Sequence, residues 1–510
     1  MATTLFLHDA VATEAGAPAN YKRIDRTQGA AAATKTMTNV AGSTPIQWTD
    51  GAGGANLAWI SDEVLTAFTL SGTITLNIRG NESNNNDNVG PQVRIYKYSG
   101  SEGAAFSTST TASEFTTSEQ ARNWTDAAPT STDFAVGDRI VVKVFAAPVG
   151  GVNMTAGTAN IYINGAAGAT GDSYVSFTEN IAFTRTRTVK SASGDYTTLS
   201  AWNTGEAADL VTLTEVRQAE LYALQDTTAL GLTATWVTSA TYFVKIYTTG
   251  AGRNTTGVYD GSNYYRLEVT NANALAISTA PGHVWVDGLQ VKVIATSGSR
   301  IGINVMTAPA TGSPVYKISN NIIQGAISGT ATGCQGLVAG TTTNAATMNA
   351  WNNIIYSFTV DGRAYQLNAA NWTVNAYNNT AYGNVYGYIG SSGVTAINCI
   401  ANNNSTDGFF STFGASSNYN TSDIASDAPG ANSRNGTAVT FNNAAGGDFR
   451  PDSTDTEANG TGTDDPGAGL FSDDITGTAR TAGWDIGAFI AEAAPATSVP
   501  NQLMMMGCGV

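Results

Sequence analysis

Charged residues are scarce in this chain of 510 residues. They make up 12% of it, about half the share that is usual in soluble globular proteins. Acidic residues outnumber basic ones, 39 to 24, and no cluster of lysine and arginine offsets the net charge of −15. We therefore expect no nucleic-acid partner, because this charge would repel a phosphate backbone. The only two histidines, His8 and His283, are too few and too distant for a histidine metal site or a catalytic triad.

Cysteines and long apolar runs are also few. The three cysteines, Cys334, Cys399 and Cys508, are odd in number and scattered, which indicates free thiols in a protein assembled in a reducing compartment. No stretch approaches the roughly 20 apolar residues of a membrane helix, so we expect no membrane insertion. The start, MATTLFLHDAVATEAG, lacks the basic segment and apolar run of a secretory signal.

The residues that are present favour short strands and turns. Hydrophobic residues make up 42% of the chain, with 9 Trp, 20 Tyr and 17 Phe, and disordered chains lack such residues. Glycine (55 residues) accompanies frequent Thr, Ala, Asn and Ser. We therefore predict an all-β protein.

The N-terminal part predicts an arm followed by a β-sandwich. Residues 1–40 show little periodicity, and we interpret them as an extended arm whose apolar Leu5, Phe6 and Leu7 insert into a neighbouring protein. From about 41 to 185 apolar residues alternate with polar ones, as in Ile74, Leu76 and Ile78. Strands of this kind, separated by long polar loops, predict an antiparallel β-sandwich of jelly-roll type.

A recurring phrase dominates the second half of the chain. It reads KISNNII (317–323), NAWNNII (349–355), NAYNNTA (375–381) and, degraded, TAINCIA (395–401), with a fainter copy, VWVDGLQ, at 284–290. Its central Asn or Asp positions lie 33, 32, 26 and 20 residues apart. A unit of this length cannot bury its own apolar face and must stack on its neighbours. Short strand runs with tight corners favour a single-chain right-handed parallel β-helix over residues 186–492, followed by a tail at 493–510.

The phrase assigns positions within each coil. Asn320, Asn352, Asn378 and Asn398 should form a structural ladder at one corner, because asparagine tolerates a left-handed backbone and its amide satisfies backbone groups. By alternation, Trp351 and Tyr377 should face outward on adjacent coils, where they would form a sugar-stacking platform. The alternative is that a loop or a sister subunit covers them.

The start and the end of this region resemble a known superfamily. SGDYTTLSAW (193–202), with N-caps at Asp195 or Thr197 for a short capping helix, precedes the strand runs, and DITGTARTAGWDIGAF (474–489) closes them. Together they resemble pectate-lyase-like single-chain β-helix proteins, a superfamily that includes polysaccharide lyases and hydrolases, bacterial surface proteins and phage tailspikes. The front part is similar to β-sandwich domains in structural proteins of tailed phages. The resemblance implies a fold, not an activity.

The acidic residues that could act in catalysis or bind a metal ion can also be explained by structural roles. Asp287, Asp361 (with Arg363) and Asp407 are each followed by Gly, which is typical of turns, so we assign no catalytic residue. Asp464, Asp465, Asp473 and Asp474 have the oxygen chemistry of a Ca²⁺ site, but a hydrated acidic loop explains them as well, and we predict no metal and no cofactor. Arg480 and Asp485 should form an ion pair that holds the C-terminal cap.

These observations lead to two hypotheses for function. The main one is a structural protein on the exterior of a tailed-phage virion, as a capsid decoration, head spike, tail spike or fibre. Its partners would be other virion proteins, sister subunits in a homo-oligomer (a trimer is favoured), and a host surface polysaccharide. The alternative is a carbohydrate-active β-helix enzyme, a polysaccharide lyase or hydrolase, either free or as a receptor-degrading spike.

Overall fold

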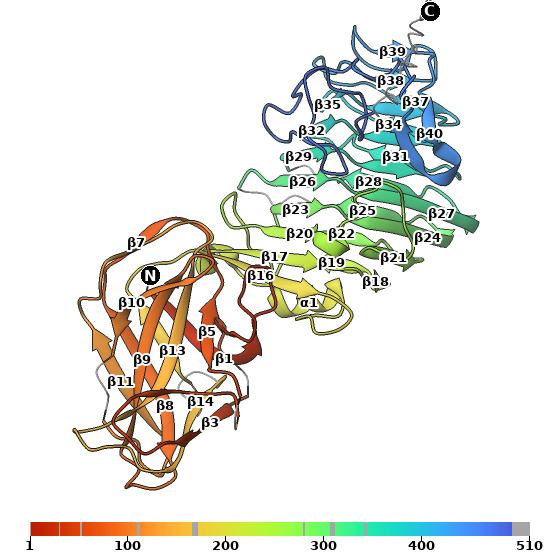
Figure 1. Cartoon of the computed structure of the whole chain (residues 1–510). Helices are drawn as coiled ribbons and strands as arrows, with labels where there is room; N and C mark the ends of the chain where they lie inside the picture. Colours follow the sequence, from red (N-terminus) through yellow and green to blue (C-terminus); the bar gives the residue numbers. More distant parts are fainter. Residues whose placement is uncertain are drawn as a thin grey trace, which may run out of the picture. The chain divides into compact units, whose positions relative to one another are not determined.

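The protein is described here by a computed structural model. It describes residues 2–29, 31–51, 54–109, 113–165, 172–278, 281–306, 312–340 and 344–491, so the predicted tail at 493–510 lies outside the described residues. The chain divides into two compact units (Figure 1). Unit 1 comprises 1–224, 231–252 and 279–285, and unit 2 comprises 225–230, 253–278 and 286–510. No helix in the described part is long and apolar enough to cross a membrane.

Unit 1 begins with a mostly antiparallel sheet wrapped around one hydrophobic core. The strand order is β10-β9-β13-β5-β2-β1-β15-β8-β14-β3, with β11 on β8 and β4 on β13, while β7 and β12 form a separate pair. The strands are β1 (Thr3–Val11), β2 (Lys22–Asp25), β3 (Ala33–Asn39), β4 (Ile46–Gln47), β5 (Ala58–Ser61), β7 (Phe68–Leu70), β8 (Ile74–Glu82), β9 (Val89–Tyr98), β10 (Glu102–Thr108), β11 (Gln120–Asp126), β12 (Thr132–Phe134), β13 (Arg139–Pro148), β14 (Gly157–Ile163) and β15 (Tyr174–Phe177). The predicted alternation is present, since Ile74, Leu76 and Ile78 all lie in the core.

The predicted N-terminal arm is wrong. Strand β1 pairs with β15 through Leu5↔Val175 and with β2 through Leu7↔Ile24. Leu5 and Leu7 are each 1% exposed and belong to the core of unit 1. The free energy gained by burying these side chains is therefore realised within their own unit, so they are not available to anchor the chain to another protein.

Parallel pairing begins within unit 1. Strand β16 (Phe183–Val189) pairs in parallel with β17 (Glu215–Leu221), which pairs in parallel with β20 (Val244–Thr248). The predicted helix is present as α1 (Leu199–Glu206), but its N-cap is Thr198, whose side chain accepts a hydrogen bond from the Ala201 amide. A second helix, α2 (Leu210–Leu213), is capped by Asp209. The remaining elements of this region are β6 (Glu63–Val64), β19 (Leu230–Leu232), η1 (Gly250–Gly252) and β23 (His283–Asp287).

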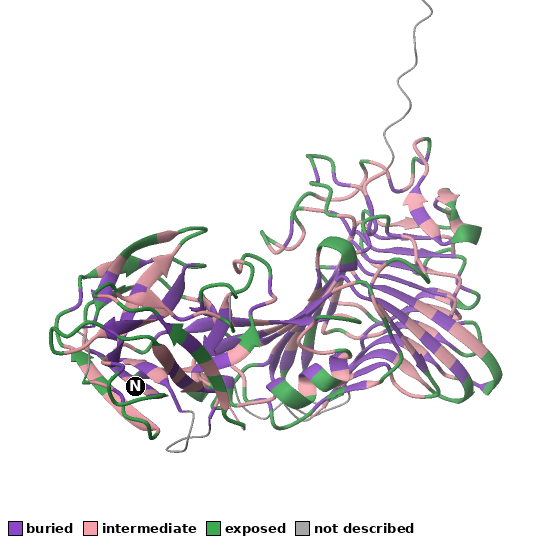
Figure 2. Ribbon diagram, turned by 60° about the horizontal axis from the view of Figure 1, so that its bottom comes forward, coloured by how far each residue is buried: buried purple, intermediate pink, exposed green. Residues whose placement is uncertain are grey.

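Unit 2 is a stack of coils with three parallel sheets, which confirms the predicted parallel β-helix. The first sheet contains β26 (Val315–Ser319), β29 (Ala346–Trp351), β32 (Trp372–Tyr377) and β35 (Val394–Ile397). The second contains β18 (Gln225–Asp226), β21 (Arg266–Thr270), β24 (Gln290–Gly298), β27 (Ile322–Ala331), β30 (Ile354–Tyr356), β33 (Thr380–Tyr382), β36 (Ile400–Asn402), β38 (Thr421–Ser422) and β39 (Arg434–Asn435). The third contains β22 (Leu275–Ile277), β25 (Ile301–Val305), β28 (Gln335–Ala339), β31 (Arg363–Gln366), β34 (Tyr386–Ile389) and β37 (Asp407–Phe410). Buried residues follow the strands from coil to coil (Figure 2).

The repeated asparagine pairs form the corner between the first and second sheets. The first asparagine of each pair has the predicted left-handed backbone, with φ of 57° at Asn320, 52° at Asn352, 49° at Asn378 and 55° at Asn398. Their amides link neighbouring coils in three places, from Asn320 to Asp287 (2.7 Å), from Asn352 to Asn320 (3.2 Å) and from Asn398 to Asn378 (3.3 Å). The predicted ladder is therefore present, although it is interrupted between Asn352 and Asn378.

The continuous ladder lies at the second asparagine of each pair, a position that the sequence analysis did not single out. The Asn321 amide donates to Asn353 Oδ1 (2.9 Å), and the Asn353 amide donates to Asn379 Oδ1 (3.0 Å). Each Oδ1 also accepts a backbone N–H of the preceding coil, as in Asn321 N–H to Asn353 Oδ1 (3.0 Å). All three side chains are fully buried, so their amides satisfy backbone groups that water cannot reach.

The C-terminal segment closes unit 2 by lying along this corner. Strands β40 (Phe441–Asn443) and β41 (Asp448–Pro451), with η2 (Ala444–Gly446) between them, precede it. Arg480 donates to the carbonyl oxygens of Asp473, Asp485 and Gly487 and to Asn352 Oδ1. The predicted ion pair with the Asp485 carboxylate is wrong, because that carboxylate accepts the amides of Gly460 and Ala491. Burial lowers the pKa of Arg480 to about 10.

Replacing Asn353 by leucine should destabilise unit 2. The substitution leaves the Asn321 amide without its acceptor and the Ile318 carbonyl oxygen without its donor (2.8 Å), and each buried unsatisfied group costs about 1–3 kcal/mol. We expect a loss of at least about 2 kcal/mol in the free energy of unfolding, measured by denaturant titration. The exposed Asn368→Leu control should change it by less than about 0.5 kcal/mol. Equal effects of the two substitutions would contradict the ladder's role.

Candidate functional site

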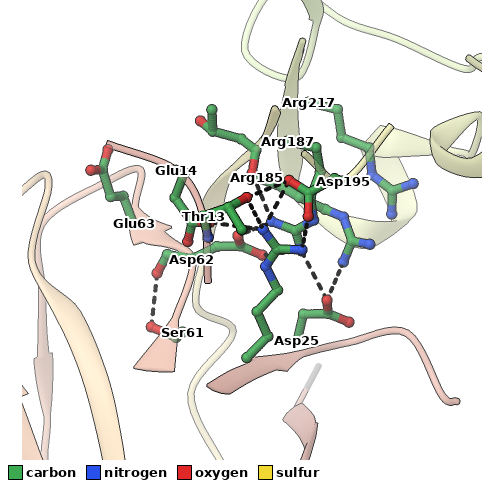
Figure 3. Close-up of polar contacts among 12 residues, drawn as sticks. Thr13, Glu14, Asp25, Ser61, Asp62, Glu63, Arg185, Arg187, Asp195 and Arg217 are labelled. Atoms are coloured by element: carbon green, nitrogen blue, oxygen red, sulfur yellow. Dashed lines mark hydrogen bonds and ion pairs between the residues drawn. The ribbon is translucent and has the colours of Figure 1, made fainter. Parts of the chain in front are cut away.

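The densest group of charged side chains is a buried network in unit 1 (Figure 3). Arg185 contacts Asp25 (2.7 Å) and Glu206 (2.7 Å). Arg187 contacts Asp25 (2.9 Å) and Asp62 (2.7 Å). Further arginines complete the network: Arg23 with Glu14 and Asp195, Arg139 with Glu14 and Glu63, and Arg217 with Glu215.

The electrostatics of this network are those of a structural element. Burial alone would raise the pKa of Asp195, but the hydrogen bond and charge of Arg23 outweigh it and lower that pKa to about 2. Burial would also raise the pKa of Asp25, but the positive charges of the neighbouring arginines hold that pKa well below its usual value. Arg187 is 3% exposed and Glu206 2%. Apart from Glu63, which is 39% exposed, the charged side chains of the network are at most 9% exposed and are paired with one another, so we assign the network to folding.

The three acids that were considered as catalytic candidates do not lie at one corner. Asp287 sits at the asparagine corner, where it contacts Arg253 (3.1 Å) and accepts hydrogen bonds from Ser319 Oγ and Asn320 Nδ2 (2.7 Å each). Asp361 is exposed in a turn with φ of 47°, directly before β31. Asp407 opens β37 in the same sheet as β31. The structure therefore places Asp361 and Asp407 at the N-terminal ends of two strands of the third sheet that β34 separates, whereas Asp287 lies at the asparagine corner.

The predicted glycan-facing aromatics have different surroundings. Trp351 is 3% exposed, because Phe471 of the C-terminal segment stacks on it (ring centroids 6.0 Å apart). The prediction that Trp351 faces solvent is therefore wrong. The alternative, that a loop covers this side chain, is confirmed. Tyr377 remains half-exposed.

The acidic residues near the C-terminus cap turns. Asp464 accepts the amides of Gly483 and Trp484, Asp465 accepts that of Gly469, and Asp474 accepts those of Thr476, Thr478 and Ile490. Burial raises the pKa of Asp473. Among the residues that the structure describes, no group of three or more His, Cys, Asp or Glu side chains could hold a metal ion.

The outer face of the third sheet is the strongest candidate for a binding site. Gln335, Arg363, Tyr386 and Asp407 occupy equivalent positions on β28, β31, β34 and β37. All four are partly exposed. At the other end of β37, Phe410 is 46% exposed and lies edge-on to Tyr386 at 5.4 Å between ring centroids. A cation, an aromatic ring and a carboxylate thus follow one another along three consecutive coils.

Residues that pack inside the coils hold this face in place. Tyr365, Tyr388 and Phe409 stack inside, with centroids 4.5 and 4.8 Å apart. The strand positions between these rings and the partly exposed outer residues hold small residues, because larger ones would not fit. A Cβ on Gly336 would lie 2.3 Å from Ile355 Cγ2, and one on Gly408 would lie 2.4 Å from Ser422 Oγ. At these glycines the chain approaches the second sheet closely, and the residues directly before them, Gln335 and Asp407, are partly exposed.

The charges on the outer face are incompletely satisfied. Within the described part of the chain, Arg363 Nε and Asp427 Oδ1 are buried atoms without a hydrogen-bond partner. Asp427 Oδ2 accepts the amides of Gly408 (2.7 Å) and Phe409 (3.1 Å), which places it beside Asp407. Burial, together with the negative charge of Asp427, raises the pKa of Asp407. Asp407 can therefore hold a proton at a pH where an ordinary aspartate has lost it.

Sequence reasoning found Arg363 and Asp407 but missed Tyr386, Phe410 and Asp427. A signal was present in the segments RAY (363–365), YGY (386–388) and DGF (407–409). Each places a polar or aromatic residue, a small residue and an aromatic ring in that order. This pattern marks the third strand of these three coils independently of the asparagine phrase.

Comparisons with known proteins add only weak likenesses. No protein-family model and no curated protein sequence matches the chain. Solved structures similar to it include a CocE/NonD family hydrolase from Staphylococcus aureus (11% identity, 35% of this chain and 36% of that chain, TM-score 0.24). Another is the catalytic domain of a GH87 alpha-1,3-glucanase in complex with nigerose (12% identity, 78% of this chain and 69% of that chain, TM-score 0.24). A third is the catalytic unit of a thermostable GH87 alpha-1,3-glucanase from Streptomyces thermodiastaticus (10% identity, 77% of this chain and 92% of that chain, TM-score 0.14). TM-scores this far below 0.5 carry no argument about function.

The buried network should make unit 1 sensitive to acid. Because the folded pKa of Asp195 is depressed to about 2, its stabilising contribution is present above the unfolded value of 3.8 and is lost as the pH falls towards 2. We expect the melting temperature, measured by scanning calorimetry, to fall between about pH 4 and pH 2. Asp195→Asn should make this fall shallower, and an unchanged pH profile in that variant would contradict the assignment.

Proposed function

We propose that the β-helix of this protein binds an extended carbohydrate chain along the outer face of β31, β34 and β37. The observation that carries the proposal is the register of Arg363, Tyr386 and Asp407 on consecutive coils. Neighbouring strands lie about 4.8 Å apart, which is close to the length of one pyranose unit. A polysaccharide lying across the strands would therefore meet one of these side chains for each sugar.

The side chains on this face suit a sugar polymer. Tyr386 and Phe410 offer apolar ring surface with a polar handle nearby, the combination that stacks on sugar rings. Arg363 offers a planar array of donors, one of which has no partner among the described residues. Asp407 offers acceptors for hydroxyl groups. These groups are fixed by the packed rings beneath them, which lowers the entropic cost of binding.

We further propose that this binding takes place on the exterior of a tailed-phage virion, as part of a capsid decoration, head spike, tail spike or fibre. The support is the surface composition, which is poor in charge and rich in Thr, Ser, Asn and Gly, and a β-helix whose free face suits a host surface polysaccharide. Other virion proteins and sister subunits, with a trimer favoured, would be its partners. Attachment would then use surfaces other than the buried Leu5 and Leu7.

A second candidate function is cleavage of the bound polysaccharide. The observation that favours it is the pair Asp407 and Asp427, since the raised pKa of Asp407 beside a second carboxylate is what a general acid requires. In a hydrolase, Asp407 would protonate the glycosidic oxygen while Asp427, held by two backbone amides, would take a proton from the attacking water. A lyase would instead need a base and a uronic acid substrate.

Substitution on the outer face should weaken binding of a host polysaccharide. We expect Tyr386→Ala to raise the Kd by about tenfold or more, equivalent to about 1.4 kcal/mol, because the ring surface is lost without disturbing the core. The measurement is isothermal titration with polysaccharide from the host cell surface. Tyr377→Ala, which removes a similarly exposed tyrosine from β32, is the matched control and should bind as the unaltered protein does. Loss of binding only in the Tyr377→Ala variant would move the site to the first sheet.

If the second candidate function holds, incubation with the bound polysaccharide should release new reducing or unsaturated ends. Asp407→Asn should lower the rate by about 10²–10⁴-fold, the usual contribution of a general acid, while Asp361→Asn at the exposed turn should not. Since Asp407 must be protonated to act, the rate should fall as the pH rises through its elevated pKa. Tight binding with no new ends from any polysaccharide would leave binding as the function.

A further inference from the structure

An open surface cavity lies near the C-terminal end of unit 2, and none of its lining residues belongs to the outer face of β31, β34 and β37. Its volume is about 420 Å³, and it is lined by Tyr419, Ala431, Asn432, Ser433, Arg434 and Thr461. Small-molecule sites usually enclose about 300–1,000 Å³, so this cavity is large enough for a single small ligand. It offers one aromatic ring and several hydrogen-bonding side chains.

The walls of the cavity are fixed by a shared side chain. Asn418 Oδ1 accepts the backbone amides of both Tyr419 (3.0 Å) and Asn432 (2.8 Å). This single amide oxygen therefore links two segments of chain that line the cavity. Behind it, Ser433 Oγ accepts the Asn420 amide (2.9 Å). A ligand would meet these groups already in position and would not have to order them.

Tyr419 has an unusual backbone conformation. Its φ is 53°, in the left-handed region that is rare for bulky residues. Such strained positions persist only where the surrounding structure determines them, and they are concentrated at functional sites. Asn418 supplies that constraint through its contact with the Tyr419 amide. Glycine or asparagine at this position would relieve the strain and would remove the ring from the cavity.

The charge of the cavity favours a neutral ligand. Among the described residues that line the cavity, Arg434 is the only cation, and its guanidinium is paired with Glu457 (Nε to Oε2, 3.4 Å). An anionic ligand would have to compete with this carboxylate. The pair leaves the remaining guanidinium N–H groups and the carboxylate oxygens as donors and acceptors for hydroxyl groups. The cavity thus combines an aromatic surface with mixed donors and acceptors and has little net charge.

We infer that this cavity binds one neutral pyranose unit, with Tyr419 stacked on the sugar ring and Asn432, Arg434 and Thr461 bonded to its hydroxyl groups. Such a subsite would hold a branch or an end of a glycan. The inference rests on the proposed function for the class of ligand, but it involves none of the residues of the outer face. The two sites can therefore be tested separately.

The experiment is saturation-transfer NMR and titration of the full chain with methyl glucoside, methyl galactoside, methyl mannoside, methyl N-acetylglucosaminide and glucuronate. At least one neutral glycoside should bind, and Tyr419→Asn should raise its Kd at least tenfold. Asparagine accepts the left-handed backbone, so the variant removes the ring without adding strain. Arg434→Gln should also weaken binding, whereas Tyr386→Ala should leave it unchanged. Melting temperatures within a few degrees of the unaltered protein would confirm that the variants fold.

Three results would overturn the inference. The first is that no neutral glycoside binds. The second is that a glycoside binds equally well to the unaltered protein and to the Tyr419→Asn variant. The third is that glucuronate binds more tightly than every neutral glycoside, which would contradict the charge argument. Loss of polysaccharide binding in Tyr386→Ala alone would leave this cavity unaffected, so failure of one site is distinguishable from failure of the other.

Discussion

The coils of unit 2 depend on a side-chain amide that replaces missing backbone hydrogen bonds at a tight corner. Between the first and second sheets the chain turns through a left-handed residue, and buried backbone groups at such a turn have no strand partner. Asn321, Asn353 and Asn379 supply both a donor and an acceptor there, and each is shared with the coil above or below. Strands of only three to six residues, such as β30 and β29, can therefore stack in register. That register is what brings Arg363, Tyr386 and Asp407 into line.

Unit 1 achieves its order by a different means. The chain has few charges, yet several of its arginines and carboxylates meet in one buried network. Buried ion pairs contribute little net stability, since desolvation offsets the attraction, but removing one partner is costly. A network in which Asp25 contacts both Arg185 and Arg187 therefore adds little net stability. Its main effect is to disfavour alternative packings of the strands, in which one of these buried charges would lose its partner. It joins β2 of the mostly antiparallel sheet to β16, which pairs in parallel with β17.

The sequence predicted the features that repeat and failed where a single contact decides. The asparagine phrase revealed the parallel β-helix and the left-handed corner, because every coil repeats the same local requirement. It did not reveal which asparagine of each pair forms the continuous ladder, since both are compatible with the turn and both are buried in most coils. Alternation placed Trp351 outside, but Phe471, far away in the sequence, covers it. The prediction of an extended N-terminal arm failed for a related reason. The sequence of β1 shows little periodicity, and Leu5 and Leu7 are buried only because β1 pairs with β15 and β2.

The outer face was hidden from the sequence because its register does not follow from spacing. Arg363, Tyr386 and Asp407 follow their corner residues Asn352, Asn378 and Asn398 by 11, 8 and 9 residues. The loops between the second and third sheets absorb these differences, so the strands align although the intervals do not. The ladder fixes the coils, and the loops are then free to change length. A β-helix built in this way can vary the side chains on its outer face from coil to coil without altering the hydrogen bonds that hold the coils together.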